Sequence, residues 1–176
     1  ADSKRGDIGN TSKAYAEAFF ASLQADALTV APYMGKDSIE PFLQYEGTCV
    51  FVLGLTSNPG SADFQMLELK SGGRLFERVI STAAKWGIGT PGEVGMVVGA
   101  TKAEMLSDIR KIAPDNVLLI PGIGAQGGDL ATVLKLGKSR DGFGMIVNAS
   151  RSILYASKEA DWARQRARKR KKPWPG

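Results

Sequence analysis

The sequence predicts an α/β protein with a parallel sheet, and two features of the chain indicate this fold class. Short apolar runs recur at residues 27–31, 48–54, 94–99, 117–120 and 144–147. They are nearly continuous rather than alternating between polar and apolar residues, which is typical of strands buried on both faces of a parallel sheet. Stretches with helical periodicity lie between them. Alternation of strands and helices indicates βαβ units.

Helices are expected in five stretches, at residues 12–23, 37–44, 75–86, 102–112 and 129–136. The clearest of them carries one apolar stripe, made by Met105, Leu106, Ile109 and Ile112. Thr101 and Glu104 fit a capping box at its start. A last helix is expected from about residue 157 into the C-terminal tail, where Pro173 and Pro175 end it.

Two architectures fit this alternation, an open doubly wound sheet and a closed barrel. The open sheet typically carries a Gly-x-Gly-x-x-Gly turn after its first strand, whereas here a glycine-rich turn follows the fourth apolar run. In (β/α)8 barrels a phosphate site commonly follows strands 7 and 8. We therefore predict a TIM barrel in which residues 117–120 are strand 7, residues 144–147 are strand 8 and residues 27–31 are strand 4.

This numbering predicts an N-terminally truncated barrel, with strands 1, 2 and most of 3 missing and residues 1–4 as the frayed end of strand 3. Residues 1–157 are expected to form a partial (β/α)8 barrel, and residues 158–176 a C-terminal helix and basic tail. Closure is what removes the edges of a barrel sheet. We therefore expect two open edges, and a chain that is a fragment or needs its missing part from another polypeptide.

The composition is that of a globular protein, with 43% apolar and 23% charged residues. No apolar run approaches the roughly 18 residues that a membrane-spanning helix needs. Residues 1–5 do not begin a secretion signal, because no apolar segment follows their charges. Cys49, the single cysteine, lies in an apolar run and is expected to be a buried small hydrophobe in a reducing compartment. A cytoplasmic location without a membrane partner follows.

The formal charge of +5 is concentrated in residues 164–172, which contain seven Lys or Arg and no acid. The rest of the chain has 16 basic and 18 acidic residues and is nearly neutral. Such a tail is usually a solvated helix end, so nucleic acid is not the expected partner. The chain contains no histidine. His-based metal sites and Ser-His-Asp triads are therefore excluded, and acid–base chemistry must use Lys, Asp, Glu, Tyr or Cys.

The first candidate site lies in residues 2–7, Asp-Ser-Lys-Arg-Gly-Asp. Residues two apart in an extended segment point the same way, so Asp2 and Lys4 should project together at the C-terminal end of a strand, where barrel active sites lie. Gly6 permits a turn that brings Asp7 around after them. Two carboxylates would keep the lysine charged and suited to proton donation to a carbanion. The alternative is a surface salt-bridge cluster.

The second candidate site is the glycine-rich segment 120–129, Ile-Pro-Gly-Ile-Gly-Ala-Gln-Gly-Gly-Asp. It follows an apolar run and precedes a helical stretch. Four glycines within seven residues let backbone N–H groups approach an anion closely, and the following helix start adds its dipole. The segment therefore predicts a phosphate site. A tight strand–helix turn without a ligand is the alternative.

Two further loops follow apolar runs. Arg151 comes directly after the last run and is placed to pair with a phosphate in a bidentate fork, although a solvated arginine at a helix start is the alternative. Residues 55–61, Leu-Thr-Ser-Asn-Pro-Gly-Ser, form a turn after the second run. Their hydroxyl and amide groups suit recognition of a base or sugar.

Taken in order, these segments resemble the orotidine 5′-monophosphate decarboxylase family over nearly the whole chain except the basic tail. Asp2-x-Lys4-x-x-Asp7, followed by Ile8 and Thr11, matches the family signature Asp-x-Lys-x-x-Asp at the end of strand 3. The other matches are the exit of strand 4 at residues 29–35, the base-reading loop at 57–60, the phosphate loop at 121–128 and the final phosphate contact at 150–151.

The resemblance implies a homodimeric (β/α)8 barrel that converts orotidine 5′-monophosphate to UMP and CO₂ without a metal or an organic cofactor. Lys4 would protonate C6 of the pyrimidine, and Asp2 would face the departing carboxylate. Asp7 would reach into the partner's site across the dimer interface. The resemblance also implies substrate contacts from Ile8 and Thr11 beside Asp7, from Ser57 to the base, from Pro121 in the pyrimidine pocket, and from Gln126, Gly127, Gly128 and Arg151 to the phosphate.

The chain departs from the family pattern in one respect. The family's second lysine, at the end of strand 2, and its substrate-binding Asp from strand 1 have no counterpart in these 176 residues. We therefore expect the chain to be inactive by itself.

Two other functions are alternatives. A sugar-phosphate decarboxylase or hexulose-phosphate synthase of the same scaffold carries the same Asp-x-Lys-x-x-Asp signature and uses Mg²⁺. A non-catalytic phosphate-binding module, localised by its basic tail, is the other. Metal dependence without a response to a UMP analogue would indicate the first, and nucleotide affinity without turnover would indicate the second.

Overall fold

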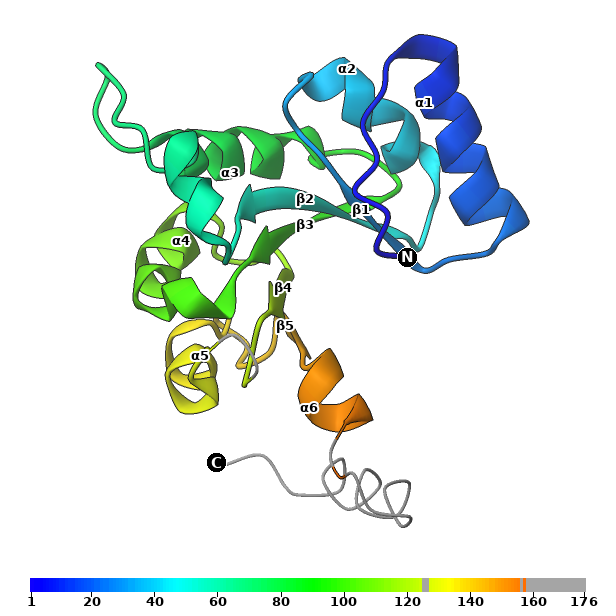
Figure 1. The fold of residues 1–176 in the computed structure, drawn as a ribbon. Coiled ribbons are helices and arrows are strands. Elements are labelled where there is room, and N and C mark those ends of the chain that lie inside the picture. Colours follow the sequence, from blue (N-terminus) through cyan, green and yellow to red (C-terminus); the bar gives the residue numbers. More distant parts are fainter. Residues whose placement is uncertain (125–126, 156, 158–176) are drawn as a thin grey trace.

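The computed structural model describes residues 1–124, 127–155 and 157. They form a five-stranded sheet in the order β1-β2-β3-β4-β5, and each strand pairs in parallel with the next. The strands are β1 (Ala27–Val30), β2 (Cys49–Leu55), β3 (Glu93–Val98), β4 (Leu118–Pro121) and β5 (Met145–Asn148). Figure 1 shows that the sheet curls like part of a barrel wall. The five predicted strands and the parallel α/β class are confirmed.

Helices and short turns connect the strands on the outside of this curl (Figure 1). The α-helices are α1 (Gly9–Ala16), α2 (Lys36–Ile39), α3 (Leu75–Trp86), α4 (Leu106–Ile112), α5 (Leu130–Leu136) and α6 (Ser150–Leu154). The other helical turns are η1 (Glu17–Ser22, π-helical) and the 3₁₀ turns η2 (Glu40–Gln44), η3 (Pro59–Asp63) and η4 (Ala100–Met105). The periodicity therefore located all five expected helical stretches, while α6 was not predicted. The expected helix beyond residue 157 lies outside the described residues.

The predicted capping box at Thr101 and Glu104 is wrong. Residues 100–105 form the 3₁₀ turn η4, and α4 begins only at Leu106, without a side-chain cap. The hydroxyl of Thr101 instead donates a hydrogen bond to the carbonyl oxygen of Ser57, 3.2 Å away. This contact joins the loop after β3 to the loop after β2, and no local sequence pattern encodes it.

The two faces of the sheet carry different side chains. One face packs against the helices, and its fully or nearly fully buried members are Leu28, Val30, Val50, Val52, Val94, Met96, Val98, Leu118 and Ile120. The opposite face lines the inside of the curl. There Thr29, Phe51 and Gly95 are register partners on three adjacent strands. The ring of Phe51 lies over Gly95, where a Cβ atom would be 2.5 Å from the ring carbon Cε1. Gly95 is therefore required by packing inside the curl.

The N-terminal segment runs beside β1. The N–H of Thr29 donates to the carbonyl of Ala1 at 3.1 Å, and the N–H of Ala31 donates to the carbonyl of Arg5 at 2.7 Å. A parallel bridge joins Arg5 to Val30. The segment thus lies where the end of a further strand was expected. Among the described residues, β5 pairs only with β4, so the sheet remains open there. The same part of the chain contains no helix long and apolar enough to cross a membrane.

Candidate active site

Most of the predicted site residues lie at the end of the sheet formed by the C-terminal ends of its strands. Because all five strands are parallel neighbours, their C-terminal ends all lie at this same end of the sheet. Lys4 lies beside the end of β1, Ser57 follows β2, Gly127 follows β4 and Arg151 follows β5. This end is where ligands bind in barrels and open α/β sheets. The lysine and the phosphate loop are therefore not at opposite ends of the sheet.

Asp2 and Lys4 form the charged pair that the sequence predicts. The ammonium Nζ of Lys4 lies 2.5 Å from Oδ1 of Asp2. Thr29 in β1 is hydrogen-bonded to both residues. Its hydroxyl donates to the same Oδ1 at 2.9 Å and accepts from the backbone N–H of Lys4 at 3.0 Å. The hydrogen bond from Lys4 lowers the pKa of Asp2, and the one from Thr29 adds to this effect against partial burial. Asp2 is therefore a carboxylate at neutral pH.

The structure does not bring Asp7 into this pair. Its carboxylate accepts a hydrogen bond from the backbone N–H of Ile8, 2.8 Å away. The left-handed turn in this segment occurs at Lys4, with φ of 48°, before Gly6 is reached. Ile8 and Thr11 are exposed at the start of α1. Ile8 and Thr11 are therefore accessible from outside the chain, and Asp7 is half-exposed.

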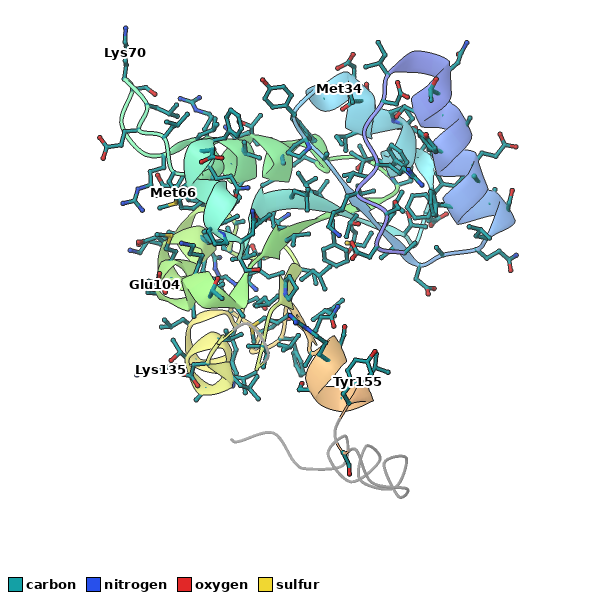
Figure 2. The ribbon with its side chains drawn as sticks, in the orientation of Figure 1. Met34, Met66, Lys70, Glu104, Lys135 and Tyr155 are labelled. Atoms are coloured by element: carbon teal, nitrogen blue, oxygen red, sulfur yellow. The ribbon has the colours of Figure 1, made fainter. Side chains whose placement is uncertain are left out.

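Ser57 lies in a loop that is fixed by hydrogen bonds from Gln65 and Thr101 and by close packing against Gly99. Gln65 accepts from the N–H of Thr56 at 2.8 Å and donates to the Thr56 hydroxyl at 2.9 Å. Thr101 holds the carbonyl of Ser57, as described above. Gly99 approaches so closely that a Cβ atom there would lie 2.6 Å from the Ser57 nitrogen. Beyond these contacts the chain extends to Lys70 at the tip of the loop before α3 (Figure 2).

Sequence reasoning missed Gln65, Thr101 and Gly99 as supports of the Ser57 loop. Their signals were present but had other interpretations. Thr101 fitted a helix cap, and Gly99 ended an apolar run. Gln65 lies nine residues from its partner Thr56 with no motif between them. Only the folded chain shows that all three fix one short loop.

The glycine-rich segment folds as a tight loop between β4 and α5. Gly127 has a left-handed backbone, with φ of 86°, and a Cβ atom there would have no other atom within 4 Å, so its surroundings are open. Gly128 is different, because a Cβ atom there would lie 2.5 Å from the Cβ of Ala100. One glycine is therefore required by conformation and the other by packing. Gln126 lies outside the described residues.

The start of α5 is occupied by the chain's own carboxylate. Asp129 is the N-cap and accepts from the N–H groups of Ala131 and Thr132 at 3.3 and 2.9 Å. The Thr132 hydroxyl also donates to Asp129, and this bond is the largest cause that lowers the pKa of the Asp129 carboxyl. The backbone N–H groups of Thr132 and Ala131 lower it further. The predicted contribution of this helix start to anion binding is therefore limited. The N–H groups of Gly127 and Gly128 donate within the loop itself, to the carbonyls of Gly124 at 2.9 Å and Gly122 at 3.3 Å.

A shallow cleft of about 170 Å³ lies between the loops after β4 and β5. It is lined by Pro121, Gly122, Ile123, Asn148, Ala149, Ser150 and Arg151. Arg151 is exposed in the first turn of α6. Within the described part of the chain no carboxylate forms an ion pair with it. The structure thus brings Pro121 and this guanidinium together beside the glycine-rich loop, an arrangement that suits a phosphate.

No group of three His, Cys, Asp or Glu side chains suited to a metal ion occurs within residues 1–124, 127–155 and 157. The described site thus consists of a lysine–carboxylate pair, polar loops and a guanidinium. Such a site can donate a proton and hold an anion.

Comparison with known proteins identifies the family of the chain. The orotidine 5′-phosphate decarboxylase / HUMPS family model matches residues 1–165. The orotidine 5′-phosphate decarboxylase of Flavobacterium johnsoniae is 55% identical over 163 residues, which cover 93% of this chain and 58% of that protein. The enzyme of the same name from Porphyromonas gingivalis is 54% identical over 167 residues, covering 95% and 59% of the two chains.

Solved structures give the same result. Leishmania donovani UMP synthase superposes with a TM-score of 0.83 at 44% identity, covering 96% of this chain and 37% of that one. Leishmania donovani OMP decarboxylase superposes with a TM-score of 0.82 at 41% identity, covering 95% and 63%. The chain thus spans somewhat less than three fifths of the length of the curated relatives above. On the family match over most of its residues, the chain belongs to the orotidine 5′-phosphate decarboxylase / HUMPS family.

Proposed function

We propose that the protein to which this chain belongs decarboxylates orotidine 5′-monophosphate to UMP in pyrimidine biosynthesis. The observation that carries the proposal is the Asp2–Lys4 pair at the same end of the sheet as the cleft of Pro121 and Arg151. The relatives that match almost the whole chain at 54% and 55% identity are orotidine 5′-phosphate decarboxylases. Their shared name indicates the substrate, and the proposal is supported by the position of the pair and the cleft at the same end of the sheet.

In the proposed reaction, the bond between C6 and the carboxyl group breaks and its electron pair stays on C6. The Lys4 ammonium then transfers a proton to C6, and CO₂ leaves. Asp2 keeps Lys4 charged and oriented through their 2.5 Å contact. Its own negative charge faces the substrate carboxylate, whose charge disappears as CO₂ forms. The pair thus supplies both the proton and a charge arrangement that favours the product.

The rest of the nucleotide would be held by the neighbouring loops. Ser57 would contact the base from a loop fixed by Gln65 and Thr101. Gly127, Gly128 and Arg151, with Gln126, would hold the phosphate, and Pro121 would line the pyrimidine pocket. Binding energy from the phosphate, far from C6, raises the rate when it is used to order the site around the reacting carbon.

We also propose that the complete protein is a cytoplasmic homodimer. The Asp7 carboxylate accepts a hydrogen bond from the N–H of Ile8, and within the described residues it forms no ion pair with Lys4. Ile8, next to Asp7, and Tyr33 and Met34, after β1, are large apolar residues that are 57%, 93% and 43% exposed. Exposed large apolar side chains such as these favour a protein interface. Sedimentation of the full-length product of the reading frame tests the dimer, and cell fractionation tests the location.

The catalytic proposal is tested with the full-length product of the reading frame that encodes this chain. UMP formation from orotidine 5′-monophosphate is expected. Lys4→Ala should lower kcat by at least about 10²- to 10⁴-fold, the usual contribution of a general acid, while UMP binding persists. Lys111→Ala is the matched control, because Lys111 forms a comparable exposed pair with Asp108 at 2.7 Å on α4. Its activity should equal that of the wild type.

Each result has a separate meaning. Absence of UMP formation by the wild type would refute the function, and substantial turnover by Lys4→Ala would remove Lys4 from its role. Activity on a sugar phosphate that depends on added Mg²⁺ would favour the other branch of the family. For the 176-residue chain by itself we propose no turnover, because the family's second lysine has no counterpart in it. UMP formation by that purified chain would contradict this.

A further inference from the structure

Thr29 is a buried polar residue on the inner face of the sheet. It is 3% exposed, and its register partners Phe51 and Gly95 are both buried. A buried hydroxyl is costly unless it is hydrogen-bonded. The Thr29 hydroxyl has two partners, and both belong to the segment that carries the proposed catalytic lysine. Its position is therefore tied to the site and not only to the packing of β1.

The direction of these two hydrogen bonds is fixed by chemistry. The backbone N–H of Lys4 can only donate, so the Thr29 oxygen accepts that bond. The hydroxyl has a single proton, which is then available for Oδ1 of Asp2, 2.9 Å away. Oδ1 also accepts from the Lys4 ammonium. The result is a closed ring in which the backbone and side chain of Lys4 are both bound through Thr29 and Asp2.

This ring has two structural consequences. It holds Lys4 at φ of 48°, a left-handed backbone conformation that is uncommon for a non-glycine residue. It also places both contacts of Asp2 on one oxygen. Among the described residues, the other oxygen, Oδ2, has no hydrogen-bond donor. Oδ1 is thus bonded to both Thr29 and Lys4.

We propose that Thr29 is a positioning residue for the decarboxylation proposed above, because its hydroxyl fixes the Asp2 carboxylate and the backbone turn that aims the Lys4 ammonium. The inference rests on the proposed function. A small error in the placement of a reacting group can cost about 10²-fold in rate. Thr29 contacts neither the reacting carbon nor the phosphate in this scheme and acts only through Asp2 and Lys4.

The test compares Thr29→Val with Thr29→Ser in the full-length product. Valine keeps the shape and removes the hydroxyl, so kcat should fall by about 10- to 100-fold while the Kd for UMP changes little. Serine keeps the hydroxyl and should restore most of kcat. Loss of the donor to Asp2 should also move the acidic limb of the pH–rate profile to higher pH. Thr48→Val is the matched control, because the Thr48 hydroxyl donates to the carbonyl of Tyr45 at the opposite end of the strands.

The outcomes separate this inference from the function on which it rests. If the wild type forms no UMP, the function fails and the inference fails with it. If the wild type is active and Thr29→Val has the same kcat and pH profile, only the inference is refuted. Thr29→Ala provides a second variant without the hydroxyl and without added bulk. If neither Thr29→Val nor Thr29→Ala folds while Thr48→Val does, the role of Thr29 is structural and the proposal is overturned.

Discussion

Cys49 is a single residue whose chemistry is set by its surroundings. It lies at the start of β2 and is a free thiol. Burial raises the pKa of the Cys49 thiol from its ordinary value of 9.0 to about 12, and repulsion by Glu93 adds to the effect. The thiolate is the reactive form, so this thiol should be inert in the folded chain. The contribution of the buried thiol to stability should be complete below pH 9.0 and lost as the pH rises toward 12.

This predicts that iodoacetamide alkylates Cys49 much more slowly in the native chain than in urea, between pH 7 and pH 9. Mass spectrometry of timed samples measures the rate. The control is Ser71→Cys in a Cys49→Ala background, because Ser71 is exposed in the loop after β2. That thiol should react at a similar rate with and without urea. Equal rates for Cys49 in both conditions would show that its thiol is not protected.

At the residue scale, sequence reasoning found what is chemically distinctive and missed what is ordinary. Asp2 and Lys4 stood out because they are two charged residues spaced two apart in a segment expected to be extended, and their pairing is present. Thr29 did not stand out, since a β-branched residue within an apolar run is normal for a strand. Its two hydrogen bonds reach residues 25 and 27 positions away. Such contacts depend on which strands are neighbours, which the sequence alone does not specify residue by residue.

At the scale of helices and strands, local periodicity was a reliable guide to position. The helix expected at residues 75–86 is α3, Leu75–Trp86, because its apolar stripe and its Glu77 contact to the Arg74 N–H are both local. The helix expected at 102–112 is divided between η4 and α4, and Lys102 at φ −116°, ψ 30° marks the break. Elements set by local pattern were predictable, and elements reshaped by distant contacts were not.

Arg110 connects several elements at the end of the sheet opposite the candidate site. Its guanidinium donates to the carbonyls of Gly137 at 2.7 Å, Asn116 at 2.7 Å and Gly144 at 2.8 Å, and also reaches Ala113 at 3.2 Å. These carbonyls end α4 and α5 and precede β4 and β5. From the sequence, Arg110 belongs to the polar face of a helix. The structure makes it a link among four elements.

We predict that Arg110→Met lowers the free energy of unfolding by about 2–4 kcal/mol, because it leaves several half-buried carbonyls without a donor. Urea unfolding followed by circular dichroism measures the change. Arg140→Met is the control, because Arg140 is exposed and forms only a weak surface ion pair, with its Nε 4.0 Å from Oδ1 of Asp115. That variant should unfold at nearly the wild-type urea concentration. A similar loss in both variants would contradict the role of Arg110 as a link.

At the scale of the whole molecule, the barrel architecture could be predicted because the order of the loops is itself a pattern. The glycine-rich loop follows the next-to-last strand, and Arg151 follows the last. Solved relatives superpose on nearly the whole chain with TM-scores of 0.82 and 0.83. How the open side of the sheet is completed could not be predicted, because it depends on surfaces that β5 and the N-terminal segment present rather than on any local pattern.

The inner face of the sheet loses burial toward the β5 edge. Val97, Leu119 and Ile146 are register partners on β3, β4 and β5. Val97 is 5% exposed, whereas Ile146 is 49% exposed. Unpaired strand edges that carry exposed apolar side chains are sites of self-association. The 176-residue chain by itself should therefore associate with increasing concentration.

We predict that Ile146→Lys reduces this association, because a charge at an open edge opposes edge-to-edge pairing. Sedimentation velocity over a range of concentrations measures it. The variant should cost little stability, since half of the Ile146 side chain is already in solvent. Ile88→Lys is the control, because Ile88 is 78% exposed in the turn after α3 and away from the edge. Ile88→Lys should associate like the wild type. A wild-type chain that stays monomeric at every concentration would show that the β5 edge is protected in solution.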